Sequence, residues 1–254
     1  MLKLIRRWFR RRPARTTPEA SRMRYVIVKA LLIGCIVLIG MSMAQAAALV
    51  PSHRPITSYQ GVVFIGDSIT AAWPIAIDFP GAINRGIGGQ TSCQMRARFA
   101  QDVIALRPGV VVILAGANDI RYYADTSTAC LFDMVQMAQA ARIGVIVGTL
   151  AANEGWAPGT PASYGEALYG LWNTAVWLGS QVYGYWVADY FDATRLNGKQ
   201  NAALFGPDKT HPNAAGYVVM TDVLRPVIAA LRQRQAECGH GIHFFITEQE
   251  AKDY

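Results

Sequence analysis

The sequence predicts an α/β fold built on a parallel sheet of about five strands, with helices covering both faces. Apolar runs alternate with segments of helical pattern along most of the chain. The apolar runs are continuous, as expected for strands that are buried on both faces of a parallel sheet. With no internal repeat, this pattern fits a single domain of roughly 200 residues.

The strand and helix positions follow from these runs and from the glycines and prolines that interrupt them. The predicted strands cover residues 62–65, 82–87, 110–115, 144–150 and 182–190. The predicted helices start near Ile69 with breaks at Pro74 and Pro80, cover 91–106 and 127–142, run from the loop 153–161 to about Gly179, and cover 212–232. Pro212 is expected in the first turn of the last helix, where a missing N–H costs nothing.

The positive charge of the chain is confined to its start. The chain has 24 basic and 17 acidic residues, a net charge of +7, but residues 1–29 hold ten Lys and Arg against Glu19 alone. The remainder therefore carries 14 basic and 16 acidic residues, or −2. A body without excess positive charge is not expected to bind nucleic acid.

The basic start is followed by an apolar segment typical of an export signal. Residues 30–50 carry no charge, and Ala44-Gln45-Ala46 is typical of a cleavage site before Ala47. The alternative is an uncleaved anchor, because a run of this length can span a bilayer. Either reading exports the body to the periplasm or the extracellular space and limits membrane contact to the N-terminal segment. The chain thus divides into a leader (1–46), a linker (47–61), a folded domain (62–235) and a tail (236–254).

Export changes the interpretation of the cysteines. With Cys35 in the leader, Cys93, Cys130 and Cys238 remain. A disulfide between Cys93 and Cys130 is permitted in an oxidising compartment, and buried free thiols are the alternative. No Cys or His spacing is typical of a zinc site, so no metal is predicted.

The stretch VVFIGDSITAAW, residues 62–73, places a serine where a strand passes into a helix. Such a turn exposes the Ser68 hydroxyl at the end of the sheet. The backbone N–H of Ser68 then lies at a helix N-terminus, which favours negative charge. Ser68 is therefore a candidate nucleophile, with a helix cap as the alternative role.

Four further residues follow strand ends or precede helices, where the sites of parallel α/β sheets lie. They are Gly89 in NRGIGGQT, Asn118 in GAND, and Asp208 and His211 in DKTHP. A serine hydroxyl needs a base, and histidine titrates near neutral pH. The alternative roles are a helix cap for Asp208, a turn for Asn118, a positive φ for Gly89 and a structural histidine for His211.

In this order, the segments resemble the SGNH (GDSL) hydrolase superfamily. GDSIT resembles its first block, NRGIGGQT its second, GAND its third and DKTHPNAAGY its last, between Gly66 and Tyr217. Gln90 stands where the family often has aspartate, which bears on neighbouring contacts. The resemblance implies a three-layer α/β/α, flavodoxin-like fold and a hydrolase of esters or thioesters that needs no cofactor.

The resemblance also implies roles for the five residues. Ser68 would be the nucleophile, His211 the general base and Asp208 the group that orients His211. The Ser68 N–H, the Gly89 N–H and the Asn118 amide would form the oxyanion hole.

The resulting expectation is an exported serine esterase that acts on a small-molecule, glycan or lipid ester through an acyl-enzyme on Ser68. The alternatives are an envelope polysaccharide acyltransferase and an inactive envelope binding protein. Asp67 and Asp119 are expected to make structural hydrogen bonds. Trp73, Tyr122 and Tyr123 line the pocket or pack beside it.

Overall fold

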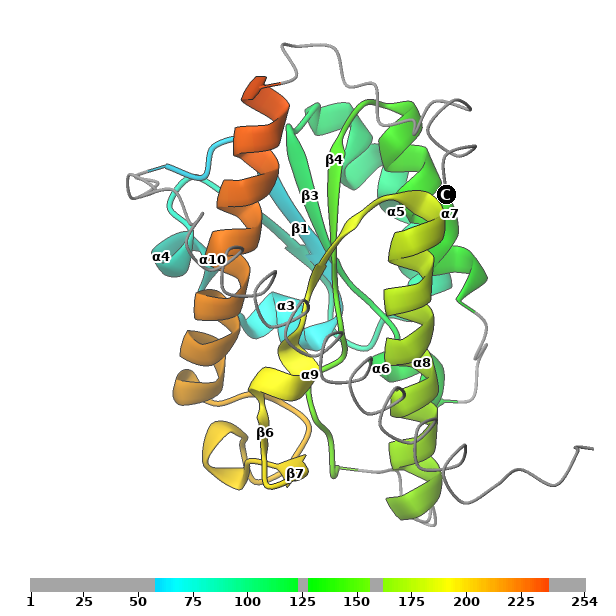
Figure 1. Cartoon of the computed structure of the whole chain (residues 1–254), viewed down its shortest axis with the longest axis vertical. Helices are drawn as coiled ribbons and strands as arrows, with labels where there is room; N and C mark the ends of the chain where they lie inside the picture. Colours follow the sequence, from blue (N-terminus) through cyan, green and yellow to red (C-terminus); the bar gives the residue numbers. More distant parts are fainter. Residues whose placement is uncertain (1–57, 123–127, 156–161, 238–254) are drawn as a thin grey trace, which may run out of the picture. The chain divides into compact units, whose positions relative to one another are not determined.

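The computed structural model describes residues 58–122, 128–155 and 162–237 (Figure 1). Contacts divide the chain into two units, Met1–Arg54 and Pro55–Tyr254, and the first lies wholly outside the described residues. The predictions for the leader, the C-terminal tail, Cys238 and Tyr123 also fall outside them.

The centre of the body is a five-stranded parallel sheet, which confirms the predicted fold class. Its strands are β1 (Val62–Gly66), β2 (Ile83–Gly86), β3 (Val110–Leu114), β4 (Gly144–Gly148) and β5 (Trp186–Ala188). Their order is β2-β1-β3-β4-β5, and every pairing is parallel. After β2 the chain crosses to the far side of β1, so the strand order reverses between β1 and β3. Ligands of such sheets bind at the carboxyl ends of the strands beside this reversal.

Helices cover both faces of the sheet and complete three layers (Figure 1). One face carries α3 (Ser68–Ala72), α4 (Ile75–Asp78) and α10 (Ala214–Glu237), and the other carries α5 (Ser92–Asp102), α7 (Ala129–Ala140) and α8 (Ala162–Tyr183). Shorter elements lie near the carboxyl ends of the strands. They are α6 (Ala117–Arg121), α9 (Tyr190–Ala193), the 3₁₀ turn Ala202–Leu204 and a hairpin of β6 (Arg195–Leu196) and β7 (Lys199–Gln200).

The central strands β1, β3 and β4 form where the apolar runs predict them because both faces of the sheet are covered there, whereas the edge strands β2 and β5 are partly exposed. Every residue of β1, β3 and β4 is buried. On the α10 face an aromatic cluster fills the core, with the rings of Phe64, Trp73 and Phe79 centred 5.0 to 5.9 Å apart. The Trp73 indole N–H donates to Thr221 Oγ1 at 3.1 Å. Trp73 therefore packs in the core and does not line the pocket.

The helix α5 begins after a reciprocal cap. Thr91 Oγ1 accepts from the Gln94 N–H, and the Gln94 side chain accepts from the Thr91 N–H. A disulfide between Cys93 and Cys130 joins the first turns of α5 and α7. Of the two alternatives for these cysteines, the structure has the disulfide.

Three predicted boundaries were wrong. The helix expected over 91–106 ends at Asp102, and a 3₁₀ turn, Ile104–Leu106, follows it. The strand expected over 182–190 is limited to Trp186–Ala188, because α8 continues to Tyr183 and ends at Gly184. Gly184 has a φ of +70° and donates its N–H to the Ser180 carbonyl at 2.9 Å, as glycines that end helices do. Pro212 is not in α10 either, since it lies in a bridge with Phe205.

The helix α10 begins at Ala214 because Asn213 caps it. The Asn213 side chain accepts the Gly216 N–H at 3.1 Å. Among the described residues, α10 alone is long and apolar enough to cross a membrane. It is a core helix, because Met220, Leu224, Ile228 and Leu231 are fully buried.

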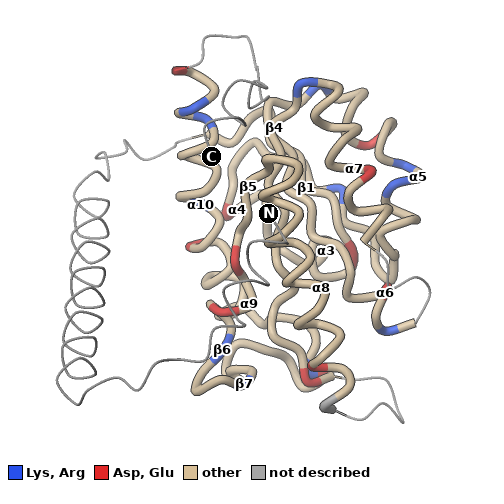
Figure 2. The backbone as a smooth tube through the Cα atoms, turned by 45° about the vertical axis from the view of Figure 1, so that its right-hand side comes forward, with Lys and Arg blue, Asp and Glu red and all other residues tan. Residues whose placement is uncertain are grey.

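The charges of the described body are mixed in sign. Figure 2 shows basic and acidic positions close together on α5, α7 and α10. Arg96 pairs with Asp133 between α5 and α7, and Arg98 pairs with Asp102 within α5, each at 2.6 Å. By contrast, α8 carries a single charged residue, Glu166, in its 22 residues.

Candidate active site

A cavity of about 500 Å³ lies at the carboxyl ends of β1 and β3. It brings together segments that follow β1, β2, β3 and β4, part of α8 and the turn before α10. All five predicted site residues line it: Ser68, Gly89, Asn118, Asp208 and His211.

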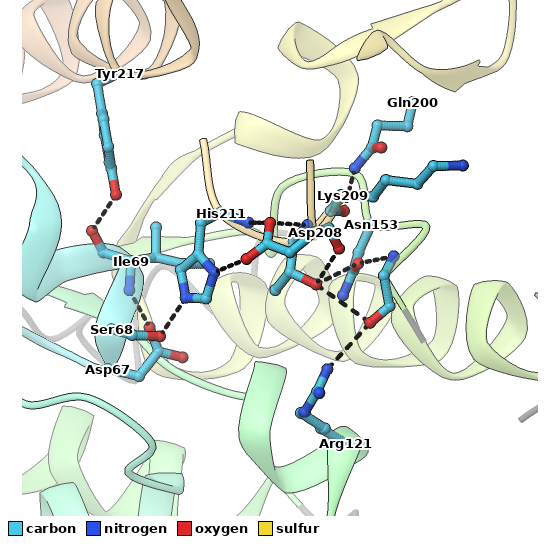
Figure 3. Close-up of polar contacts among 12 residues, drawn as sticks. Asp67, Ser68, Ile69, Arg121, Asn153, Gln200, Asp208, Lys209, His211 and Tyr217 are labelled. Carbon is cyan, nitrogen blue, oxygen red and sulfur yellow. Dashed lines mark hydrogen bonds and ion pairs between the residues drawn. The ribbon is translucent and has the colours of Figure 1, made fainter. Parts of the chain in front are cut away.

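Ser68 is the first residue of α3 and is half-buried. Asp67 caps this helix, because its carboxylate accepts the Ile69 N–H at 2.9 Å. The strand and the cap together fix the backbone on either side of Ser68. Its Oγ lies 2.8 Å from Nε2 of His211, although 143 residues separate the two in the chain (Figure 3).

His211 and Asp208 share a short turn. Nδ1 of His211 lies 2.6 Å from Oδ2 of Asp208, and the backbone N–H groups of Thr210 and His211 each donate to Asp208 Oδ1 at 3.0 Å. A proton on Nδ1 directed to the carboxylate leaves Nε2 free to accept the Ser68 hydroxyl proton.

These contacts stabilise the negative charge of Asp208. Partial burial raises the pKa of the Asp208 carboxyl, but the hydrogen bonds from His211 and Thr210 outweigh it and lower that pKa to about 2. Asp208 is therefore a carboxylate at neutral pH and can stabilise a protonated His211.

Asn118 connects the ends of three strands. It lies in α6, just after β3, and its amide nitrogen donates to the Gln90 carbonyl at 3.0 Å and to Asp67 Oδ2 at 3.3 Å. Gly89 lies between β2 and α5 with a φ of +76°, and a Cβ at this position would meet nothing within 4 Å. The backbone at Gly89 therefore faces open space at the cavity.

Asp67 and Asp119 make the structural hydrogen bonds expected of them. Burial raises the pKa of Asp67 to about 6, although the Ile69 N–H opposes this rise. Asp119 accepts from the backbone N–H and the hydroxyl of Ser92, which fixes α6 against the start of α5.

The cavity is lined by Tyr122, as expected from the sequence, and by residues that the sequence did not single out. Its far wall is formed by Ile120, Arg121 and Tyr122 after β3 and by Leu168 and Tyr169 of α8. Asn153, from the segment after β4, donates its amide to the Tyr169 hydroxyl at 2.6 Å. The position of Asn153 just beyond a strand end was the available signal.

No metal centre occurs in the described part of the chain, where no three His, Cys, Asp or Glu side chains are grouped to hold an ion. The polar side chains that line the cavity include the Ser68 hydroxyl, the His211 imidazole, the carboxylates of Asp67 and Asp208 and the amides of Asn118 and Asn153. This set suits nucleophilic attack on a carbonyl carbon.

The fold and the site together are typical of a hydrolase that combines a parallel α/β sheet with a candidate serine nucleophile. Residues 64–219, more than half of the chain, match the model of the GDSL-like lipase/acylhydrolase family. The chain belongs to this family and is an ester hydrolase.

Solved structures agree with this assignment. The chain is similar to a protein of Bacteroides fragilis assigned to the acylhydrolases, with 33% identity and a TM-score of 0.60, over 75% of this chain and 94% of the other. It is similar to a GDSL-like lipase of Bacteroides thetaiotaomicron, with 26% identity, a TM-score of 0.59 and coverage of 77% and 97%.

A catalytic mutant of Axe2, an acetylxylan esterase of Geobacillus stearothermophilus, is also similar. It has 25% identity and a TM-score of 0.55, over 67% of this chain and 94% of the other. No curated protein sequence matched the chain.

Proposed function

We propose that the protein is an exported serine esterase that removes short acyl groups from carbohydrates through an acyl-enzyme on Ser68. The observation that carries this proposal is the continuous contact from Ser68 Oγ to His211 at 2.8 Å and from His211 to Asp208 at 2.6 Å. A nucleophile in contact with a base, and that base in contact with an orienting carboxylate, form a catalytic triad.

In the first half of the reaction, Ser68 Oγ attacks the carbonyl carbon of the ester while His211 Nε2 takes the hydroxyl proton. The charge on His211 is stabilised by Asp208, whose low pKa keeps it ionised. When the tetrahedral intermediate collapses, the bond to the alcohol breaks and His211 returns its proton to the leaving oxygen. The products of this half are the free alcohol and the acylated serine.

In the second half, water replaces the alcohol. His211 takes a proton from the water, the resulting hydroxide attacks the acyl carbon, and the carboxylic acid leaves. The proton then passes from His211 to Ser68 Oγ, which regenerates the enzyme.

The oxyanion of each intermediate is assigned to the N–H groups of Ser68 and Gly89 and to the Asn118 amide. Both hydrogens of that amide have acceptors in this structure, Gln90 O at 3.0 Å and Asp67 Oδ2 at 3.3 Å. We assign the longer bond, to Asp67, as the one that the oxyanion replaces. A donor placed in this way contributes about 3–4 kcal/mol to the transition state.

Two observations support a carbohydrate ester in an exported setting. The acetylxylan esterase Axe2 is similar over most of its length, and a cavity of about 500 Å³ is within the range that holds small organic ligands. The uncharged run 30–50 after a basic start, together with the disulfide of Cys93 and Cys130, supports an oxidising compartment outside the cytoplasm.

Labelling with a fluorophosphonate probe tests the nucleophile. The wild-type protein should be labelled and the Ser68→Ala variant should not, while His211→Ala should be labelled far more slowly. Equal labelling of the wild type and Ser68→Ala would overturn the assignment of Ser68.

A panel of esters then tests the substrate class. It should include acetylated xylo-oligosaccharides and p-nitrophenyl esters of two, four and eight carbons. Faster release of acetate from the sugars than of octanoate supports a carbohydrate deacetylase, whereas the reverse order contradicts it. Recovery of newly acylated sugar in place of free acid would indicate an acyltransferase. The N-terminal residue of the protein recovered outside the cytoplasm tests cleavage before Ala47.

A further inference from the structure

The turn that carries Asp208 and His211 is exposed and contains an unfavourable backbone conformation. The side chains of His211 and Asp208 are 41% and 53% exposed. Between them, Lys209 has a φ of +55°, in the left-handed region that residues with a Cβ avoid. Such a conformation persists only where surrounding contacts hold it, so the turn needs support from outside itself.

Gln200, at the end of the β6–β7 hairpin, supplies one such support. Its side-chain amide nitrogen donates to the Lys209 carbonyl at 2.7 Å (Figure 3). The same nitrogen donates to the Ala152 carbonyl at 2.8 Å. Both partners of the amide nitrogen are backbone carbonyl oxygens, which accept hydrogen bonds only from a donor. Gln200 therefore joins the turn to the segment that follows β4. The Oε1 atom of Gln200 is buried and has no hydrogen-bond partner within the described residues. Both side-chain hydrogen bonds of Gln200 are therefore donated by its NH₂ group.

The segment after β4 also contacts this turn directly. The Glu154 N–H donates to the Lys209 carbonyl at 3.2 Å, and Thr210 Oγ1 lies 3.2 Å from the Gly155 carbonyl. Gly155 packs so closely that a Cβ there would overlap the Asp208 carbonyl oxygen and Thr210 Oγ1. The backbone of Asp208 thus rests directly on Gly155.

We infer that Gln200 and Gly155 are positioning residues that hold the turn so that His211 reaches Ser68. Neither residue takes part in the chemistry, because the Gln200 side chain and the Gly155 backbone both act on the backbone of the turn. This inference rests on the proposed roles of Asp208 and His211. It also explains why the β6–β7 hairpin, which lies outside the sheet, matters for the active site.

The test compares Gln200→Ala, Gln200→Glu and Gly155→Ala with Gln139→Ala as the matched control. Gln139 also donates its amide to a backbone carbonyl, that of Tyr183, but joins α7 to the end of α8. The Gln200 and Gly155 variants should lose about 10- to 100-fold in kcat for p-nitrophenyl acetate, with KM within about twofold, because small displacements of catalytic groups cost this much. Gln139→Ala should keep the wild-type kcat.

A proton resonance provides a readout that loss of stability alone does not change. The proton between His211 Nδ1 and Asp208 Oδ2 should give a downfield signal in the wild type and in Gln139→Ala. In folded Gln200→Ala and Gln200→Glu, this signal should shift upfield or broaden. Adding Lys209→Asn to Gln200→Ala should restore part of kcat, because asparagine adopts the left-handed region more readily.

Wild-type kcat and an unchanged proton signal in folded Gln200 variants would overturn the inference. An equal loss of kcat in Gln139→Ala would also overturn it, by assigning the effect to general stability. If Gln200→Ala fails to fold, Gln200→Glu and Gly155→Ala decide the question by the same two measurements. If Ser68→Ala keeps its activity, the proposed function fails, while the proton signal still reports whether Gln200 positions His211.

Discussion

Replacing Asp67 with asparagine should stabilise the protein at neutral pH and slow its reaction. Asp67 is only 1% exposed, and burial raises its pKa from 3.8 to about 6. A difference of about 2 pKa units at about 1.4 kcal/mol each corresponds to about 3 kcal/mol of unfavourable free energy in the folded, ionised state. Asparagine has nearly the same shape, caps helices equally well and carries no charge.

The sign follows from the folded pKa being higher than the unfolded one. Below pH 3.8 the Asp67 carboxyl is protonated in both states, so the substitution changes the free energy of unfolding little. Between pH 3.8 and 6 the unfolded chain releases the proton first, and this group makes the wild type progressively less stable. Above pH 6 this electrostatic gain of about 3 kcal/mol should be present in full, less about 1 kcal/mol for the hydrogen bond from Asn118 that the new side chain cannot accept.

The same substitution should lower kcat by about tenfold or more. The carboxylate of Asp67 accepts both the Ile69 N–H and the Asn118 amide. The new side chain has a single acceptor oxygen, so its NH₂ group would face the Asn118 amide and disturb an oxyanion donor.

Urea unfolding of the wild type and Asp67→Asn at intervals from pH 4 to pH 8 measures this difference. Asp222→Asn on the exposed side of α10 serves as a control for the loss of one negative charge. Parallel stability curves for the wild type and Asp67→Asn would refute the reasoning. If the free energy of unfolding rises equally in Asp222→Asn, the effect comes from the change in net charge and not from the burial of Asp67.

Three other substitutions probe the site and the fold. Asn118→Ala should lower kcat by about 10²- to 10³-fold with little change in KM; near-normal hydrolysis of p-nitrophenyl acetate would contradict its role as an oxyanion donor. Replacing Cys93 and Cys130 together with serine should lower the free energy of unfolding by about 4 kcal/mol, from a loop closed over 37 residues. Equal urea midpoints would argue against the bond. Gly116→Ala should cost about 3 kcal/mol or more, because Gly116 has a φ of +124° and its Cβ would overlap Trp172; an unchanged thermal midpoint would contradict this.

The strands and the order of layers could be predicted because the sheet is buried on both faces. Continuous apolar runs such as 110–115 have few other places in a soluble fold, and the helices between them force parallel pairing. The residues that line the cavity could be proposed for a related reason. Parallel strands bring their carboxyl ends together, so Ser68, Gly89 and Asn118 meet wherever the strands pair.

The end of α8 could not be read from local pattern. Residues 182–190 are rich in aromatic and β-branched side chains, which favour strands. Tertiary packing overrides this preference, since the Tyr183 ring stacks on Phe132 with centroids 5.0 Å apart and the Tyr185 hydroxyl donates to the Val176 carbonyl. The glycine at position 184 was the signal for the helix end.

The support of the turn that carries Asp208 and His211 also could not be predicted from the sequence. Gln200 lies in a two-stranded hairpin of two residues a side, too short to show a period. Its importance arises from contacts with the carbonyls of Lys209 and Ala152, and backbone carbonyls are the same for every residue type. Gln200 can therefore be identified as a supporting residue only from the folded structure.

One wall of the cavity comes from the helix α8, which affects how the substrate preference of this enzyme could evolve or be engineered. The helix α8 contributes Gly165, Leu168 and Tyr169 to the cavity but none of the five residues assigned to bond making and breaking. If the five residues have the roles proposed for them, the wall of the cavity and the reacting groups lie partly in separate segments of the chain. A mutational library restricted to Gly165 and Leu168 should therefore change which esters the enzyme hydrolyses, while the five residues assigned to catalysis keep their positions.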